Sequence, residues 1–317
     1  MSGTAPPPPR RTLVIGEALV DAVIDASGAV VEHVGGSPAN VAFGLAALDH
    51  PVDLATWIAT DERGHRIEAV CRERGVALTR GSQSAAFTSV AQATLDDTGA
   101  ATYVFDLDWQ LPTIPDLTAY GHVHTGSIAA VIEPGGGDVR ATLAAARATG
   151  ATVSYDPNAR PSLMGAPTDA RRLIEEAIAA ADVVKLSDED VEWLCPGEEL
   201  DDVIAAWGAL GPALLVVTRG GAGATVRVQS TGEVQAVPAP RVDVVDTVGA
   251  GDSFMAGLVS GLLDADLLGG RAQRDRLRGA SFDDVAPAVH RALRTGALTV
   301  ERAGAHAPRR ADLPQPT

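Results

Sequence analysis

Short runs of β-branched and other apolar residues alternate along most of the chain with alanine-rich stretches whose apolar positions recur at helical spacing. The first kind of run is typical of buried strands and the second of amphipathic helices. The expected strand and helix pairs lie at 13–15 and 38–48, 52–58 and 63–74, 122–125 and 138–149, 151–155 and 169–181, and 183–186 and 189–194. A further strand is expected at 214–218, and late helices at 251–263 and 282–299. This alternation predicts an α/β fold with a mostly parallel sheet covered by helices on both faces.

Two segments interrupt the alternation. Residues 20–34 and 88–106 each have the pattern of strand, turn and strand, with Asp-Ala-Ser-Gly and Asp-Asp-Thr-Gly at the turns. Because no helix is available to cover these hairpins, we expect them to form a small second sheet over one edge of the main layer. Such a sheet would act as a lid or as a dimer surface. A third irregular stretch, the Arg- and Gly-rich segment 269–280, is expected to be an exposed loop.

The two ends of the chain differ in composition from the rest. Residues 1–11 include four consecutive prolines and are expected to be a disordered arm, and residues 307–317 a flexible tail. A length of 317 residues permits two domains or one large α/β domain. We expect one domain at 12–306, with the lid formed from about 20–34 and 88–106.

Composition and charge exclude several classes of protein. Hydrophobic residues make up 46% of the chain and charged residues 21%, which is enough for a sizeable core. The net charge of −16 repels nucleic acids and anionic lipid surfaces, so we expect no nucleic-acid partner. No apolar run of about 18 residues exists, and we expect neither export nor a membrane span. Cys71 and Cys195 lie far apart in the sequence, outside any disulfide or zinc pattern, and a reducing cytoplasm is the expected location.

The segment 246–257, Asp-Thr-Val-Gly-Ala-Gly-Asp-Ser-Phe-Met-Ala-Gly, carries the most chemical information. Gly249 and Gly251 permit close backbone approach at a turn that leads into a helix. The free amides of a helix N-terminus bind an anion such as a transferring phosphate. Asp252 would lie in the first turn, where a charged carboxylate can accept the proton of an attacking hydroxyl. An N-capping aspartate after an ordinary loop is the alternative.

A second glycine segment, Gly-Gly-Ser-Pro-Ala-Asn at 35–40, precedes an expected helix, with Ser37 as a candidate N-cap. Small residues followed by the amide of Asn40 would let a polyhydroxylated ligand lie against the backbone. Plain helix capping explains the same residues. Asp21 alternates with apolar neighbours and, on this pattern alone, belongs to the solvent face of a strand.

Together, the two glycine segments resemble the two signatures of the ribokinase-like (PfkB) sugar kinases, and the resemblance extends over about residues 12–306. It is strongest to fructokinases. The resemblance implies a three-layer α/β/α sandwich with a mostly parallel central sheet and a β lid. It also implies transfer of phosphate from ATP to a primary sugar hydroxyl, with Mg²⁺ and in many members a monovalent cation such as K⁺. We further expect a homodimer that forms through the lid.

The resemblance assigns roles in phosphoryl transfer and sugar binding. Asp252 is implied as the catalytic base, and the 249–251 turn as the source of the amides that hold the anion. These amides belong to Gly249, Ala250 and Gly251. The implied sugar-binding positions are Asp21, Gly35, Gly36, Asn40 and Arg160.

For the nucleotide and the ions, the resemblance points to loops after later strands. The implied ATP positions are Lys185, Ser187, Thr218, Gly220 and Gly223. The implied metal positions are Asp190 for Mg²⁺, and Asp246 and Val248, beside 303–304, for the monovalent cation. Ser187 and Asp190 replace the Asn and Glu of the family's magnesium segment, and an acidic first helical turn favoured by the helix dipole is the alternative. Lys185, the only lysine of the chain, either reaches a phosphate or stands there by chance.

The choice of sugar rests on four segments, 16–21, 125–127, 156–163 and 185–189, which look like fructokinase forms. They favour fructose 6-phosphate as the product. Kinases of 2-keto-3-deoxygluconate and other sugars share the Asp-Pro-Asn-x-Arg form, so these and ribosyl compounds are alternative substrates. A sugar-binding regulator without activity is an alternative of another class, and the intact Asp252 argues against it. A nicotinamide dehydrogenase is disfavoured because the first strand lacks the glycines that should follow it.

Overall fold

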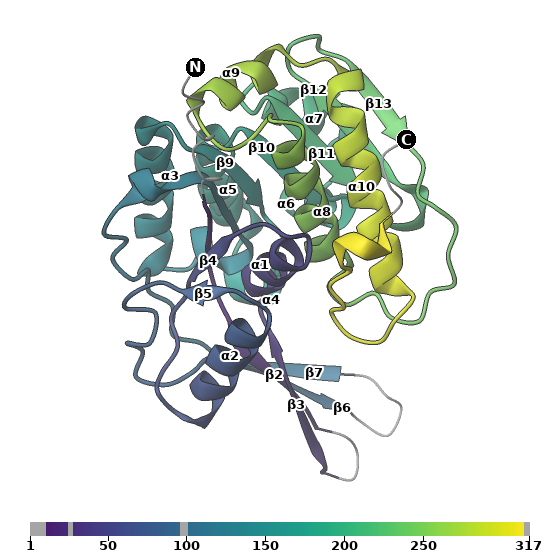
Figure 1. The fold of residues 1–317 in the computed structure, drawn as a ribbon. Coiled ribbons are helices and arrows are strands. Elements are labelled where there is room, and N and C mark those ends of the chain that lie inside the picture. Colours follow the sequence, from purple (N-terminus) through teal and green to yellow (C-terminus); the bar gives the residue numbers. More distant parts are fainter. Residues whose placement is uncertain (1–10, 25–27, 96–100, 314–317) are drawn as a thin grey trace.

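The computed structural model describes residues 11–24, 28–95 and 101–313, and a nine-stranded sheet lies at the centre of this part of the chain (Figure 1). Its strands are β1 (Arg11–Ile15), β4 (Val52–Ala55), β5 (Ala77–Leu78), β8 (Tyr120–Gly126), β9 (Thr152–Asp156), β10 (Val183–Ser187), β11 (Leu214–Thr218), β12 (Ala224–Val228) and β13 (Val234–Val237). Their order is β13-β12-β11-β10-β9-β8-β1-β4-β5. Strands from β5 to β11 pair in parallel, and β12 runs antiparallel to both of its neighbours. The loops that follow the parallel strands therefore meet at one edge of the sheet.

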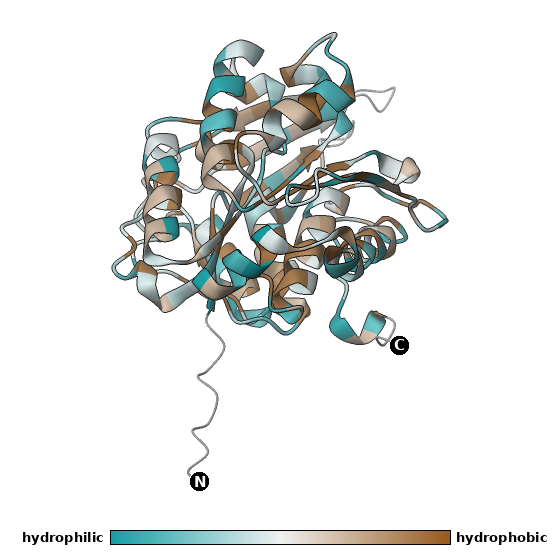
Figure 2. Cartoon of the chain, turned by 90° about the horizontal axis from the view of Figure 1, so that it is seen from above, coloured by the Kyte–Doolittle hydropathy of each residue, from teal (hydrophilic) through white to brown (hydrophobic). Residues whose placement is uncertain are grey.

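Helices cover both faces of this sheet, as the alternating pattern predicts. One layer contains α1 (Ser37–Ala47), α8 (Ala250–Asp264) and α10 (Phe282–Val300), and the other α3 (Gly135–Thr149), α5 (Pro167–Ala180), α6 (Asp188–Leu194) and α7 (Leu200–Gly208). Along β11, Leu214 and Val216 pack toward the first layer and Leu215 and Val217 toward the second. Figure 2 shows hydrophobic residues along the central strands and hydrophilic residues on outer helical turns. The three-layer α/β/α fold is confirmed.

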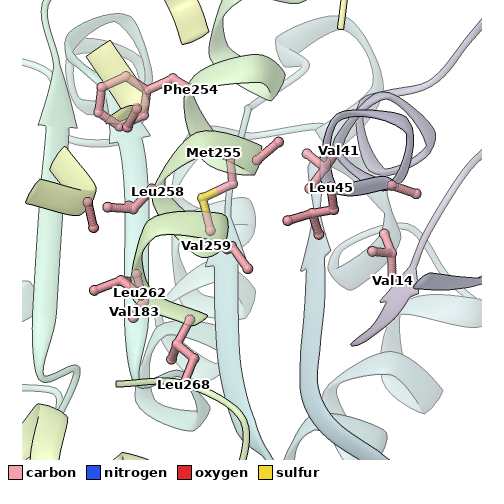
Figure 3. Packing of buried hydrophobic residues seen from close by; sticks show 14 of the residues in the cluster. Val14, Val41, Leu45, Val183, Phe254, Met255, Leu258, Val259, Leu262 and Leu268 are labelled. Carbon is pink, nitrogen blue, oxygen red and sulfur yellow. The ribbon is translucent and has the colours of Figure 1, made fainter. Parts of the chain in front are cut away.

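Helix α8 is the central element of the first layer. Every residue from Asp252 to Leu262 is buried, and the helix packs against both α1 and α10. Figure 3 shows Met255 and Val259 of α8 in the same apolar cluster as Val41 and Leu45 of α1. A helix that is apolar on all sides belongs to a protein core. The turn that begins α8 is therefore held by a rigid support.

The two predicted hairpins form the small second sheet. Its strands are β2 (Leu19–Ile24), β3 (Val30–Gly35), β6 (Val90–Leu95) and β7 (Ala101–Asp106), in the order β3-β2-β6-β7. Each hairpin is antiparallel, and β2 pairs with β6 in parallel, which joins the two hairpins. In Figure 1 this sheet, called the lid below, projects from one end of the main body.

The expected loop at 269–280 is wrong, because residues 271–279 form a helix, α9 (Arg271–Gly279). Arg274 and Leu277 lie on its buried face. The Nε of Arg274 donates a hydrogen bond of 3.1 Å to the buried carboxylate of Asp182, at the start of β10. This ion pair and the burial of Leu277 in the core join α9, whose local sequence is largely polar, to the main body.

At the ends of the chain, residues 1–10 and 314–317 lie outside the described residues. Arg11, the last residue of the expected arm, begins β1 and forms an ion pair with Asp53. Within the expected tail, the guanidinium of Arg310 donates to the carbonyl of Leu48 at 2.6 Å and contacts Asp264. The remaining helices are α2 (Glu62–Glu73) and the short α4 (Pro161–Met164). No helix in the described ranges has the length and apolar character needed to cross a bilayer.

The close packing of α8 against α10 depends on glycine. A Cβ atom at Gly261 would lie 2.5 Å from the Cα of Ala288, so the two backbones would have to separate. We expect Gly261→Ala to lower the free energy of unfolding by about 1–3 kcal/mol, the usual cost of overpacking. Gly279→Ala is the matched control, because a Cβ there meets open space at the end of α9.

Urea denaturation of the two variants measures the difference. The control should be unchanged or more stable by up to about 1 kcal/mol, since alanine favours helix more than glycine does. Equal stability of the two variants would show that the α8–α10 contact is not tight.

Candidate active site

The loops at the carboxyl edge of the main sheet bring predicted site residues together with two residues, Glu17 and Asn158, that the sequence did not assign. Glu17 follows β1, Asn158 follows β9, Ser187 ends β10 and Thr218 ends β11. These four strands lie within a single run, β11-β10-β9-β8-β1. The early glycine loop at 35–40 starts α1 beside the same edge. In an open parallel sheet this edge is the usual place for ligands.

The late glycine segment forms the predicted tight turn. Gly249, the N-cap of α8, has φ of 75°, and a Cβ there would lie 2.8 Å from the Cα of Ala305. Among the described residues no side chain caps this helix end. The amide of Ala250 donates to the carbonyl of Thr247 at 3.2 Å. Because the first amides of a helix have no intrahelical partner, the N-terminus of α8 can bind an anion.

The carboxylate of Asp252 lies in the first turn of α8 and meets the early glycine loop. Its Oδ1 accepts from Ser37 Oγ at 2.7 Å and from Asn158 Nδ2 at 3.2 Å, and its Oδ2 accepts from Asn40 Nδ2 at 2.8 Å. Asp252 is 6% exposed. Three donors thus fix the orientation of this carboxylate. Ser37 and Asn158 are contacts that the sequence alone did not assign.

The predicted sugar-binding residues surround Asp252 from the lid side. A Cβ at Gly35 would lie 1.9 Å from Oδ2 of Asp21, and one at Gly36, where φ is 103°, 2.4 Å from the carbonyl of Glu17. The pKa of Asp21 is raised, mainly by burial, while Arg160 lowers it and Asp252 raises it further. The charged groups of Asp21, Arg160 and Asp252 are therefore close enough to interact electrostatically. The guanidinium of Arg160 is held by the carbonyl and side chain of Asn158, at 2.8 and 2.7 Å.

Glu17 is a site residue that the sequence interpretation missed. It is 7% exposed, and its Oε2 has no hydrogen-bond partner among the described residues. Burial raises the pKa of Glu17 to about 7, although Ser127 and Arg160 lower it. The available signal was a lone acid in the segment 16–19, where its neighbours are small or apolar. Its carboxyl group takes part in the charge balance around Asp252.

Lys185 lies under the glycine turn. Its Nζ is 3.0 Å from the position of a Cβ at Gly251 and 2.9 Å from Oδ2 of Asp156. Lys185 is 3% exposed and Asp156 is fully buried. Burial lowers the pKa of Lys185, but the nearby carboxylates, Asp156 first among them, outweigh burial and raise it above its ordinary value. The ammonium of Lys185 is therefore held beside the predicted phosphate site by its ion pair with Asp156.

Ser187 and Asp190 form a capping box at the start of α6. The Oδ2 of Asp190 accepts from the amide of Ser187 at 2.7 Å, and its Oδ1 from the amide of Ala159 at 2.7 Å. Asp190 is 6% exposed. Both oxygens are thus engaged by backbone, and Asp190 ties the loop after β9 to the end of β10.

The predicted nucleotide turn follows β11. Thr218 Oγ1 donates to the carbonyl of Leu186 at 3.3 Å, and the amide of Arg219 donates to the carbonyl of Gly223 at 2.8 Å. Gly220 and Gly223 have φ of 48° and 99°. A Cβ at Gly223 would lie 2.0 Å from the carbonyl of Val237, so only glycine fits.

The predicted cation loop brings Asp246 to residue 304. The carboxylate accepts from the amide of Val248 at 3.0 Å and from the amide of Gly304 at 2.8 Å. These bonds, that of Val248 first, lower the pKa of Asp246. Val248 is 57% exposed. No group of three or more His, Cys, Asp or Glu side chains positioned for a metal ion exists in the described ranges.

A helix terminus with amides available to an anion, beside an oriented carboxylate and a buried ammonium, is an arrangement suited to phosphoryl transfer. The pattern of the pfkB family carbohydrate kinases matches residues 10–312. A fructokinase from Klebsiella pneumoniae is 36% identical over 257 residues, which cover 78% of this chain and 83% of the relative.

Solved structures agree with this match. The fructokinase of Xylella fastidiosa with bound ATP has a TM-score of 0.79 at 25% identity, over 93% of this chain and 94% of that one. A fructokinase from Vibrio cholerae O395, with bound fructose, ADP and potassium ion, has a TM-score of 0.75 at 24% identity over 95% of each chain, which shows the common fold. The chain belongs to the pfkB family of carbohydrate kinases, and it is an ATP-dependent sugar kinase with the ribokinase-like fold.

The carboxyl group of Glu17 makes stability depend on pH. In the folded state it stays protonated up to a pKa of about 7, against an ordinary value of 4.5. The folded protein therefore binds more protons between these values, and the free energy of unfolding falls by about 3 kcal/mol as pH rises through them. Glu17→Gln should remove this part of the decline. The free energy of unfolding of the variant should therefore rise relative to that of the wild type by about 3 kcal/mol between pH 4.5 and a pH above 7.

Urea denaturation across this pH range measures the effect. Glu73→Gln, at an exposed position of α2, serves as the control and should follow the wild type at every pH. Parallel curves for all three proteins would show that Glu17 ionises normally.

Proposed function

We propose that this sugar kinase is a fructokinase, which transfers the γ-phosphoryl group of ATP to a primary hydroxyl of fructose to give fructose 6-phosphate. The observation that carries the proposal is the contact between the Asp252 carboxylate and the early glycine loop, through Ser37 at 2.7 Å and Asn40 at 2.8 Å. It brings a proton acceptor, an anion site and a polar ligand loop to one place. The fructokinase relatives support fructose as the acceptor.

The acceptor sugar would lie between the lid and the carboxyl edge of the main sheet. Asp21, on β2 of the lid, offers carboxylate oxygens to sugar hydroxyls. Gly35 and Gly36 let the carboxylate of Asp21 and the carbonyl of Glu17 lie close to the loop backbone, and Asn40 adds an amide. Arg160 places a positive charge within electrostatic range of Asp21. We propose that these five residues bind the sugar.

Asp252 would accept the proton of the attacking hydroxyl as the oxygen–phosphorus bond forms. The donors Ser37, Asn40 and Asn158 hold its carboxylate in one orientation, which lowers the reorganisation needed during transfer. The amides of the 249–251 turn would face the transferring group, from Gly249 and Gly251 directly and from Ala250 in addition to its 3.2 Å hydrogen bond to the carbonyl of Thr247. Lys185, buried beneath Gly251, adds a positive charge that offsets the negative charge growing there.

The nucleotide would occupy the turn after β11, with Thr218, Gly220 and Gly223 against it and Ser187 on the neighbouring strand end. Mg²⁺ usually binds one or two carboxylates, several waters and the phosphates, so the site fits an ion held mainly by ATP. The engaged oxygens of Asp190 suit a positioning role, with Asp188 and Glu189 exposed in the same turn. Bound Mg²⁺ supplies neutralisation of phosphate charge.

A monovalent cation, K⁺, would be held beside the anion turn by Asp246 and the backbone of Val248. Each oxygen of the Asp246 carboxylate accepts one amide hydrogen bond, from Val248 or from Gly304, and keeps further lone pairs. The potassium ion in the Vibrio cholerae relative supports this proposal. The loop is thus suited to an oxygen-ligated ion next to the start of α8.

Loss of the proton acceptor tests the proposed function. Wild-type protein should release ADP from ATP and Mg²⁺ faster with fructose than with other hexoses, pentoses, nucleosides or 2-keto-3-deoxygluconate. Asp252→Asn should lower kcat by about 10²-fold or more, because amide nitrogen does not accept the proton, while calorimetry should show fructose binding retained.

Asp138→Asn is the matched control, since Asp138 is an exposed acid in the first turn of α3 and should leave kcat unchanged. Equal turnover of the Asp252 variant and the wild type would contradict the assignment of the base. No ADP release with any sugar would contradict the kinase assignment, and preference for another sugar would contradict fructose alone.

We also propose that two copies associate through the lid. Val30, Val31 and Val104 of the lid strands are 55%, 54% and 59% exposed. Exposed apolar residues on the edges of a small sheet favour pairing with a second copy. Light scattering should show a dimer for the wild type.

The pair of substitutions Val30→Asp and Val104→Asp, at two positions that the strand register places on one face of the lid, should shift this dimer toward monomer, because it places charges in the apolar contact. Val234→Asp, on the outermost strand β13 and 47% exposed, is the control and should remain dimeric. A monomeric wild type, or a dimer in the double variant, would contradict association through the lid.

A further inference from the structure

A groove of about 540 Å³ lies between α3 and α9, far from the candidate active site. Arg274 donates to the carbonyl of Ala151, immediately before β9, whereas Asn158 follows the opposite end of that strand. Five residues of strand separate these ends by roughly 16 Å. The groove is lined by Ala144, Arg147, Ala148, Arg271, Arg274, Asp275 and Arg278. Four arginines thus gather on a protein whose net charge is −16.

Arg274 forms the base of the groove and is committed to the protein. It is 8% exposed. Its guanidinium bonds to Asp182 at 3.1 Å, to the carbonyl of Arg147 at 3.2 Å and to the carbonyl of Ala151. The positive charge of Arg274 is therefore balanced by the buried carboxylate of Asp182.

The other three arginines keep most of their donors. Arg147 donates to the carbonyl of Ala179 at 3.1 Å and lies 4.0 Å from Asp182, and Arg271 reaches the carbonyl of Ala148 at 3.5 Å. For Arg278, no hydrogen bond or ion pair joins it to another described residue. A guanidinium has five N–H donors, so the hydrogen bonds of Arg147 and Arg271 to backbone carbonyls use only a minor part of their donors.

The arrangement on α9 separates two kinds of arginine. Arg271, Arg274 and Arg278 follow the spacing i, i+3 and i+7, which places them on one helix face toward the groove. Arg276 lies off this face and pairs with Asp266. The same short helix thus carries one arginine outside the groove, Arg276, which has an acidic partner, and three arginines that line the groove.

Charge within the groove is unbalanced. Four guanidinium groups face two carboxylates, Asp182 below and Asp275 at the rim, which leaves an excess of two positive charges. Burial lowers the pKa of Arg147, and repulsion from Arg274 and Arg278 lowers it further against the attraction of Asp182. An anion in the groove would relieve this repulsion, and planar guanidinium groups match phosphate oxygens in pairs.

We propose that this groove is a second ligand site, which binds a small molecule bearing a diphosphate or two phosphate groups. Arg147, Arg271 and Arg278 supply the hydrogen bonds to phosphate oxygens, and Arg274 holds α9 in place. The volume of about 540 Å³ accommodates a compound of sugar-bisphosphate size. A long polyanion such as a nucleic acid does not suit a surface that is otherwise strongly acidic. The site requires no catalysis and is independent of the proposed function.

Isothermal titration calorimetry of the full chain with inorganic diphosphate tests the site, and fructose 1,6-bisphosphate forms the second arm. ADP is left out of both arms, because its diphosphate would compete for the groove, and the binding that belongs to the groove is the part that the groove variants remove. We expect binding that weakens at high salt. Arg271→Ala and Arg278→Ala should each weaken it at least tenfold, because each removes a charge-assisted contact.

Arg276→Ala is the matched control on the same helix and should bind as the wild type does. All of these arginines are exposed, so the thermal midpoints should stay close to that of the wild type. Binding of inorganic diphosphate that the Arg271 and Arg278 substitutions weaken would show that phosphate groups alone are enough for recognition. If only the bisphosphate binds in this way, the ligand is an organic compound. Absence of binding for both probes, or equal affinity in the Arg271, Arg278 and Arg276 variants, would overturn the proposal.

Discussion

The buried carboxylate of Asp252 is the constraint on which the site depends. An ionised carboxylate out of water costs several kcal/mol unless donors replace its hydration. Ser37, Asn40 and Asn158 provide those donors from the start of α1 and from the loop after β9. The start of α8, the early glycine loop and the carboxyl edge of the sheet are therefore held together by one group. Close packing of α8 against α1 sets the distance at which these contacts form.

An acidic protein that binds phosphate must concentrate its few positive charges. The chain has 25 basic and 41 acidic residues, so long-range attraction does not draw an anion to the molecule as a whole. Lys185 places its ammonium beneath the glycine turn, where it forms a buried ion pair with Asp156 at 2.9 Å. A nucleotide site here would therefore depend on the local arrangement of charge and not on the net charge.

Several features were predictable because their signals are local. Periodicity showed the α/β layers and the two lid hairpins, and glycine spacing located both loops that meet at Asp252. Helix α9 was missed, because its short, Arg-rich sequence lacks an apolar stripe, and one of its contacts with the main body is to Asp182, 92 positions from Arg274. Glu17 was missed as well, since its raised pKa arises from burial by elements distant in the sequence.

The amino-acid sequence by itself determined the type and order of the elements, the two glycine turns and the acid placed in the first turn of a helix. Only the tertiary structure decided which groups meet that acid, because Ser37 and Asn40 are 215 and 212 residues away from Asp252 in the chain. It also gave Asp190 its two backbone partners and assembled the arginine groove between α3 and α9. The physical reason is that hydrogen bonding and desolvation depend on distance in space, which strand order and helix packing set.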